Sequence, residues 1–177
     1  MELFLLDMRK WAEFLLHPKR FFSRKAKIDI RVLLLEVLVA AFITSFLSEY
    51  AGFLTGAWAY VYTYTVLQRV ATGFLDVLVF GVLAFYLSKL LKGVGNLPQN
   101  MLATALPTVI LWVVVIFTLN THIAIVELPM MLFLFAYTVL GLKYVNKYSW
   151  MKAVGAFLIV FFVSGFLTAF FWKLMPF

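Results

Sequence analysis

Long apolar runs separated by short polar breaks dominate the hydropathy pattern of this chain. A helix that crosses a bilayer needs about 20 mostly apolar residues, because the hydrocarbon core is about 30 Å thick and each residue rises about 1.5 Å. Five runs meet this requirement, at residues 30–48, 70–91, 101–119, 126–142 and 151–172. The pattern therefore predicts an all-α integral membrane protein with five transmembrane helices, which together form a membrane domain over residues 29–177.

Residues 50–67 are also apolar, but we expect them to form an outer-face segment rather than a sixth span. Ser48–Tyr50 leaves almost no room for a turn after the first span. Gly52 and Gly56 have a spacing that permits close helix contact, whereas Tyr60–Thr65 alternates with the period of a strand. Since an open strand edge cannot face lipid, this segment is helical, interfacial or covered by protein.

The first 28 residues predict a cytosolic and interfacial segment. Residues 2–16 favour an amphipathic helix whose apolar face is made by Phe4, Met8, Trp11 and Leu15. Pro18 ends it, because proline cannot continue the hydrogen-bond ladder. We expect contact with anionic headgroups, with both phenylalanines inserted in lipid, through Trp11, Pro18, Lys19, Arg20, Phe21, Phe22, Arg24, Lys25 and Lys27. The alternatives are charges that only fix the topology, and an apolar face that packs on the spans.

Composition and charge narrow the class of protein. The chain is 65% hydrophobic and 13% charged, against about 45–50% and about 25% in soluble domains, which excludes an ordinary soluble enzyme and a disordered chain. If the N-terminus is cytoplasmic, 13 of the 15 Lys and Arg lie inside, and only Arg69 and Lys173 lie outside. Because Lys and Arg accumulate in cytoplasmic loops, the N-terminus is predicted to be cytoplasmic and the C-terminus outside. The net charge of +7 is thus a topology signal, and no nucleic-acid partner is expected.

Three residues within the spans are candidates for function. Glu36 and Asp76 interrupt the first two spans, and ionisable residues in a membrane are functional hypotheses by default because burying them is costly. A structural role, with carboxyl groups bonded to hydroxyls or backbone, is the alternative to an ion, proton or lipid pathway. We place Glu36 about two turns from the inner side and Asp76 about two turns from the outer side, so they are not expected to touch. Pro107 is expected to kink the third span.

Chemistry-bearing motifs are absent from the sequence. There is no cysteine, and hence no thiolate metal site or disulfide framework. No nucleophile–base constellation, phosphate loop or metal-ligand spacing occurs either. We therefore expect no enzyme activity, no cofactor and no metal.

Several short motifs are informative when they are taken together, through the order in which they occur. Pro18-x-x-Phe21-Phe22 precedes the spans, Lys92-Gly93 precedes the span with Pro107, and the last span follows Gly141-Leu142-Lys143-x-x-Asn146-Lys147-Tyr148-Ser149. This order resembles the Yip domain family (Ypt/Rab-interacting, YIPF-like), in its minimal prokaryotic form. The resemblance implies five spans, a cytoplasmic N-terminus and a non-enzymatic role in membrane organisation or trafficking-type processes. The acidic-aromatic motif of the eukaryotic cytosolic region is absent, so Rab binding is not implied.

The resulting functional hypothesis is a membrane scaffold or adaptor, in the cell membrane if the source is prokaryotic. Its inner face, made by residues 1–29, 89–100 and 143–152, would contact anionic headgroups or a cytosolic protein partner. Seams of small residues, such as Gly165 and Ala169, serve the bundle or a homo-oligomer. The alternative function is transport of a small solute, ion or lipid through the bundle with the use of Glu36 and Asp76.

Overall fold

The computed structural model describes residues 8–23, 28–54, 63–119 and 124–174, and this part of the chain contains helices and short connections but no strand. The helices are α1 (Met8–Leu16), α2 (Pro18–Ser23), α3 (Ile30–Leu54), α4 (Thr63–Leu90), α5 (Leu97–Leu119), α6 (Ala124–Asn146) and α7 (Trp150–Leu174). The all-helical class expected from the sequence is confirmed.

Four of these helices, α3, α4, α6 and α7, are long and apolar enough to cross a membrane, and Leu97–Val113 of α5 is a shorter apolar stretch. Large apolar side chains remain uncovered on the outside of the bundle, such as Phe162 with 69% and Phe166 with 73% of its surface exposed. Lipid solvates such a surface, whereas water does not. The fold is therefore that of an integral membrane protein.

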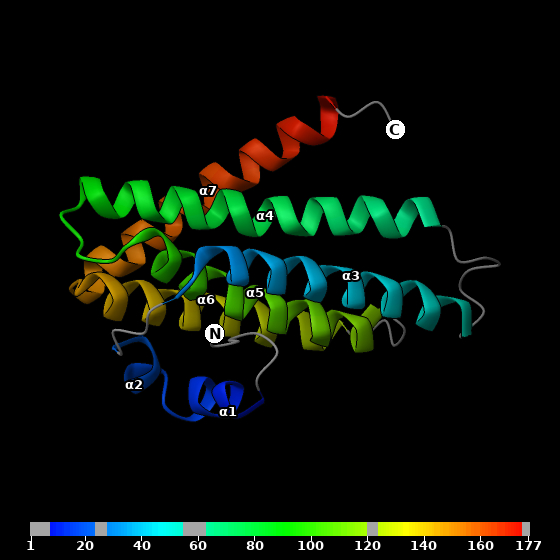
Figure 1. Cartoon of the computed structure of the whole chain (residues 1–177), viewed down its shortest axis with the longest axis horizontal. Coiled ribbons are helices and arrows are strands. Elements are labelled where there is room, and N and C mark those ends of the chain that lie inside the picture. The colour runs from blue at the N-terminus through cyan, green and yellow to red at the C-terminus, as the bar shows by residue number, and fades with distance from the viewer. Residues whose placement is uncertain (1–7, 24–27, 55–62, 120–123, 175–177) are drawn as a thin grey trace.

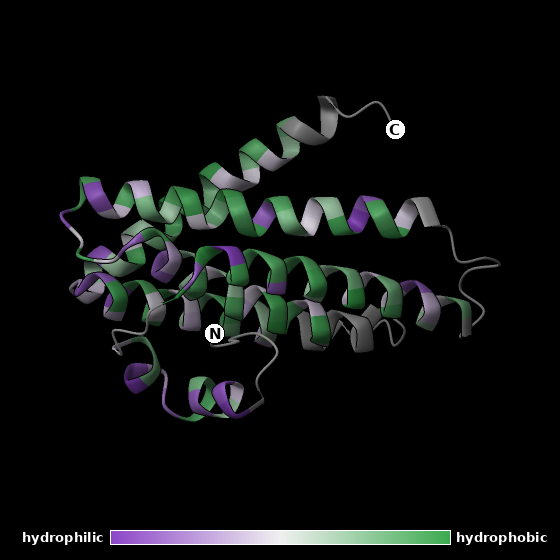
Figure 2. Ribbon diagram, in the orientation of Figure 1, coloured by the Kyte–Doolittle hydropathy of each residue, from purple (hydrophilic) through white to green (hydrophobic). Residues whose placement is uncertain are grey.

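Helices α3 to α6 run side by side as an elongated bundle (Figure 1). Helix α5 is central, since it contacts α3, α4 and α6, and residues 101–107 along it are all buried. Helix α7 starts against α4 and α6 and then diverges from the bundle toward the C-terminus. Helices α1 and α2 lie against one side of the bundle, near the end at which α4 stops. Figure 2 shows hydrophilic residues gathered on α1, α2 and that same end, with hydrophobic residues along the long helices.

The two short helices are held by the main hydrophobic core. Phe14, Phe21 and Phe22 are at most 7% exposed and pack edge to face with one another, with ring centroids 5.2–5.7 Å apart. They share one cluster with Val37 of α3 and Met101 of α5. This arrangement corrects the expectation that Phe21 and Phe22 insert into lipid, because α2 docks on α6 and the protein itself covers both rings.

The buried face of α1 also differs from the predicted one. Phe14 is fully buried, whereas Leu15, which the periodicity assigned to the apolar face, is 40% exposed. Trp11 is partly buried against the core as expected for an apolar face, and Phe4 lies outside the described residues. The apolar face that packs on the spans, left open from the sequence, is the arrangement found.

The segment at residues 50–67 divides between two long helices. Residues 50–54 form the last turn of α3, and α4 begins at Thr63, while residues 55–62 lie outside the described part of the chain. Helix thus prevails over the strand-like alternation at Thr63–Thr65, because a helix satisfies its own backbone hydrogen bonds in an apolar environment. Both helices are longer than the expected spans.

Candidate functional site

Most basic residues of the long helices lie at one end of the bundle. Arg31 lies at the start of α3, and five lysines lie at the end of α4 or around the turn between α6 and α7: Lys89, Lys92, Lys143, Lys147 and Lys152. Adjacent helices alternate in direction, so these residues share one end of the bundle, which α1 and α2 adjoin.

At the opposite end Arg69 is neutralised by an ion pair. Its Nη1 lies 3.0 Å from Oε1 of Glu49, whose side chain is 2% exposed, and donates a 2.9 Å hydrogen bond to Ser48. A buried ion pair needs such extra hydrogen bonds to offset desolvation. From the sequence, Arg69 is predicted to be an outer-face charge, but its partner is not predicted. Glu49 becomes a neighbour of Arg69 only when α3 and α4 pack together.

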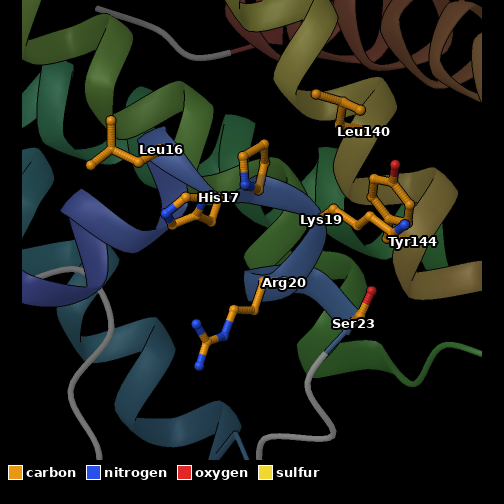
Figure 3. Close-up of a pocket in the computed structure, with 8 residues that line it drawn as sticks. Leu16, His17, Lys19, Arg20, Ser23, Leu140 and Tyr144 are labelled. Carbon is orange, nitrogen blue, oxygen red and sulfur yellow. The ribbon is translucent and has the colours of Figure 1, made fainter.

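A hollow of about 530 Å³ lies where α1 meets α2 (Figure 3). Its walls come from the α1–α2 segment and from α6. The lining residues are Leu16, His17, Pro18, Lys19, Arg20 and Ser23 from the segment and Leu140 and Tyr144 from α6. Among the expected headgroup residues, Pro18, Lys19 and Arg20 line this hollow. Arg24, Lys25 and Lys27 lie outside the described residues.

Two contacts fix the α1–α2 segment to the bundle, and a third joins α1 to α2. The hydroxyl of Tyr137 on α6 donates a 2.9 Å hydrogen bond to the carbonyl of Leu15, and its ring lies 5.0 Å from that of Phe14. Within the segment, Nε of Arg20 lies 3.8 Å from Oε1 of Glu13. Lys19 and Arg20 themselves are exposed, so the core supports a cationic surface without covering it.

A buried amide cluster closes the same end of the bundle. Asn146 donates through Nδ2 to Oδ1 of Asn100 at 2.8 Å and accepts through Oδ1 from the backbone N–H of Gly95 at 3.1 Å. Nδ2 of Asn100 donates in turn to the carbonyl of Asn96 at 2.9 Å. The cluster ties the connection between α4 and α5 to the end of α6. The sequence placed Asn146 only within a motif and missed Asn100, whose burial comes from packing.

Both turns at this end have the same cap. Lys92 and Lys147 adopt left-handed φ angles of 59° and 56°, and the next residue of each donates back to the carbonyl five residues earlier, at 2.6 Å from Gly93 and 2.9 Å from Tyr148. This is a Schellman-type helix end. Burial raises the pKa of the Tyr148 hydroxyl, which donates to the carbonyl of Ser88 at 3.1 Å.

Asp76 lies near the middle of α4 and lines a second, larger cavity. It is 13 residues after Thr63 and 14 before Leu90, so it is about 20 Å from either end of the helix and deeper than the two turns expected. Oδ1 of Asp76 accepts a 2.8 Å hydrogen bond from the Thr168 hydroxyl of α7. This is the cross-helix hydroxyl contact that the structural interpretation of the sequence expected.

The other polar residues of the spans behave differently. Thr44 and Ser164 hydrogen-bond to carbonyls of their own helices rather than across helices. Glu36 is 2% exposed on α3 and does not line the Asp76 cavity. Helix α5 continues through Pro107, and the kink expected there stays a prediction.

In the described ranges, no group of three or more His, Cys, Asp or Glu is placed to hold a metal ion. No known family model, curated protein or solved structure matches the chain.

Proposed function

We propose that the protein is a five-span, non-enzymatic scaffold or adaptor of the membrane, with α5 as the fifth span. In this proposal the basic end of the bundle and the N-terminus face the cytoplasm, and the C-terminus lies outside. The positive-inside rule supports that orientation, and the neutralised Arg69 at the other end strengthens the charge asymmetry. The motif order that resembles the Yip family agrees with a role in membrane organisation, by analogy alone.

The hollow between α1, α2 and α6 carries the functional part of the proposal. An anionic phospholipid headgroup fits its chemistry, because Lys19 and Arg20 supply charge-assisted donors for a phosphate. Leu16 and Leu140 supply apolar contacts for the part of the lipid next to the headgroup. The protein thus holds anionic lipid at a fixed place beside the bundle, and the same surface is available to organise other components of the membrane.

Ligand-dependent stability tests this site. The melting temperature of the full chain in neutral detergent should rise with dioctanoyl phosphatidylglycerol and not with dioctanoyl phosphatidylcholine, because a ligand that binds the folded state stabilises it. The double variant K19A/R20A should lose the rise. The variant R31A/K152A removes two exposed charges at the same end but outside the hollow, and it should keep the rise. An equal response of both variants would contradict the proposal.

A second candidate function is transport through the bundle, favoured by the position of Asp76 in a cavity within the spans. Reconstituted vesicles test it, since transport requires flux above that of protein-free vesicles that falls when Asp76 is replaced by Asn. Equal flux with and without protein would remove this candidate and leave the scaffold proposal untouched.

A further inference from the structure

A cavity of about 740 Å³ opens among the spans, and α4, α5, α6 and α7 all contribute residues to it. Most of its lining comes from the C-terminal half of α7, the part of that helix that diverges from the bundle (Figure 1). Gly165 lines it, and a Cβ atom added there would meet nothing within 4 Å. The small-residue seam of α7 therefore borders free space instead of another helix. A volume of this size is in the range of about 300–1,000 Å³ that holds small organic ligands.

The polar chemistry of the cavity centres on Asp76, its one acidic or basic lining residue. The Thr168 hydroxyl donates to the carboxylate at 2.8 Å. The other described hydroxyls of the lining, Thr108 and Ser164, donate to backbone carbonyls of their own helices. Within the described residues no Lys or Arg forms an ion pair with Asp76. The cavity thus presents a single carboxylate whose cationic partner is missing from the described chain.

The depth of Asp76 makes a cationic partner valuable. The residue lies near the middle of a helix long enough to span the membrane, where an isolated charge costs several kcal/mol. A ligand cation that reaches the cavity would offset this cost, because opposite charges attract strongly in an apolar medium.

The walls of the cavity favour a cation with an apolar body. Four phenylalanines line it, Phe80, Phe161, Phe162 and Phe166. The faces of aromatic rings attract organic cations, and quaternary ammonium groups are recognised in this way. Phe162 and Phe166 are largely exposed on the outside of α7, so the cavity adjoins the surface that lipid covers. An amphipathic ligand dissolved in the bilayer has direct access to it.

We propose that the cavity between α4 and α7 binds an amphipathic organic monocation, with the ammonium-type charge on Asp76 and the apolar body against the phenylalanines. The proposal is independent of the headgroup site, since it uses different residues. The proposal rests on the second candidate function, transport, only for its functional role: the organic cation would then be the class of substrate that is transported.

Binding of tetraphenylphosphonium tests the proposal directly. The full chain is placed in nanodiscs of zwitterionic lipid, and equilibrium dialysis measures binding above that of empty nanodiscs. We expect saturable binding of one cation per chain. Triphenylphosphine oxide, which has a similar body and no net charge, should not compete. Binding that does not saturate, or equal competition by the neutral compound, would overturn the proposal.

Variants assign the site to its residues. Asp76→Asn should weaken binding about tenfold or more, equivalent to about 1.4 kcal/mol. Asp29→Asn is the matched control, because Asp29 lies outside the spans and asparagine also accepts the hydrogen bond from the backbone of Arg31. Thr168→Val, which leaves the carboxylate in place, should alter affinity less than Asp76→Asn. Unchanged affinity of a folded Asp76→Asn protein would refute the assignment. If that variant does not fold, the competition by the neutral compound decides.

Flux measurements separate this inference from the transport candidate. Saturable binding without flux of tetraphenylphosphonium in vesicles would leave the site in place and remove transport of organic cations. Flux of other solutes without cation binding would overturn the site and keep transport.

Discussion

The side-chain amide of Asn146 donates a 2.8 Å hydrogen bond to that of Asn100, 46 residues earlier, and both side chains are at most 2% exposed. Replacing Asn146 with Ala leaves the N–H of Gly95 and the Oδ1 of Asn100 without this partner. We expect a loss of about 1–3 kcal/mol of unfolding free energy, measured by denaturation of the full chain in detergent. Val94→Ala, at a side chain of the same connection that is 60% exposed, should cost less.

Two glycines give a matched pair for the packing of this end. A Cβ at Gly95 would lie 2.5 Å from Cγ1 of Val145 and 2.6 Å from Oδ1 of Asn146, whereas one at Gly155 would meet nothing within 4 Å. We predict that Gly95→Ala lowers the melting temperature. Gly155→Ala in α7 should leave it unchanged or raise it, since alanine favours helix by about 1 kcal/mol. Equal effects of the two substitutions would contradict the packing of the connection against α6.

Phe22 distinguishes a docked α2 from one that lies in lipid. It is 5% exposed, and its Cζ is 3.1 Å from where a Cβ on Gly141 would stand. Phe22→Ala should destabilise the protein by about 3–5 kcal/mol and expose Lys19 and Arg20 to faster cleavage by trypsin. Leu16→Ala, at a side chain that is 72% exposed, is the control. A stability equal to that of the unchanged protein would mean that lipid, and not the bundle, surrounds Phe22.

The absence of cysteine makes the orientation simple to measure. A single Asn96→Cys substitution, in the connection between α4 and α5, should be shielded from a membrane-impermeant maleimide in intact cells and react once the cells are opened. A cysteine at Phe53, on the exposed side near the end of α3, should react in intact cells. The reverse pattern would invert the proposed topology.

The sequence predicts the features that depend on local pattern and misses those that depend on tertiary packing. The spans follow from hydropathy, because a bilayer requires continuous apolar helices and their residues are contiguous in the chain. The burial of Phe14 in place of Leu15 does not follow, because periodicity defines an apolar stripe but not which part of it another helix covers. Helix α3 ends later and α4 begins earlier than the expected spans. The reason is that a helix satisfies the hydrogen bonds of its own backbone in an apolar environment.

The same distinction applies to the candidate sites, whose residues the sequence indicates but whose cavities it does not. Asp76 is visible in the sequence as a charge within a span, and Lys19 and Arg20 as part of a basic run. The cavity around Asp76 depends on the divergence of α7, and the hollow depends on the docking of α2 to α6. Neither the divergence of α7 nor the docking of α2 on α6 can be predicted from a local stretch of sequence. The same holds for Glu49 and Arg69, which meet only across two packed helices.

The lipid retained by the protein tests the central claim most directly. Native mass spectrometry of the full chain, released from micelles with equal amounts of phosphatidylglycerol and phosphatidylcholine, measures which lipid stays bound. We predict a preference for phosphatidylglycerol in the unchanged protein and in R31A/K152A, and the loss of that preference in K19A/R20A. An unchanged preference in K19A/R20A, or no preference in any form, would contradict the claim that the hollow between α1, α2 and α6 holds an anionic headgroup.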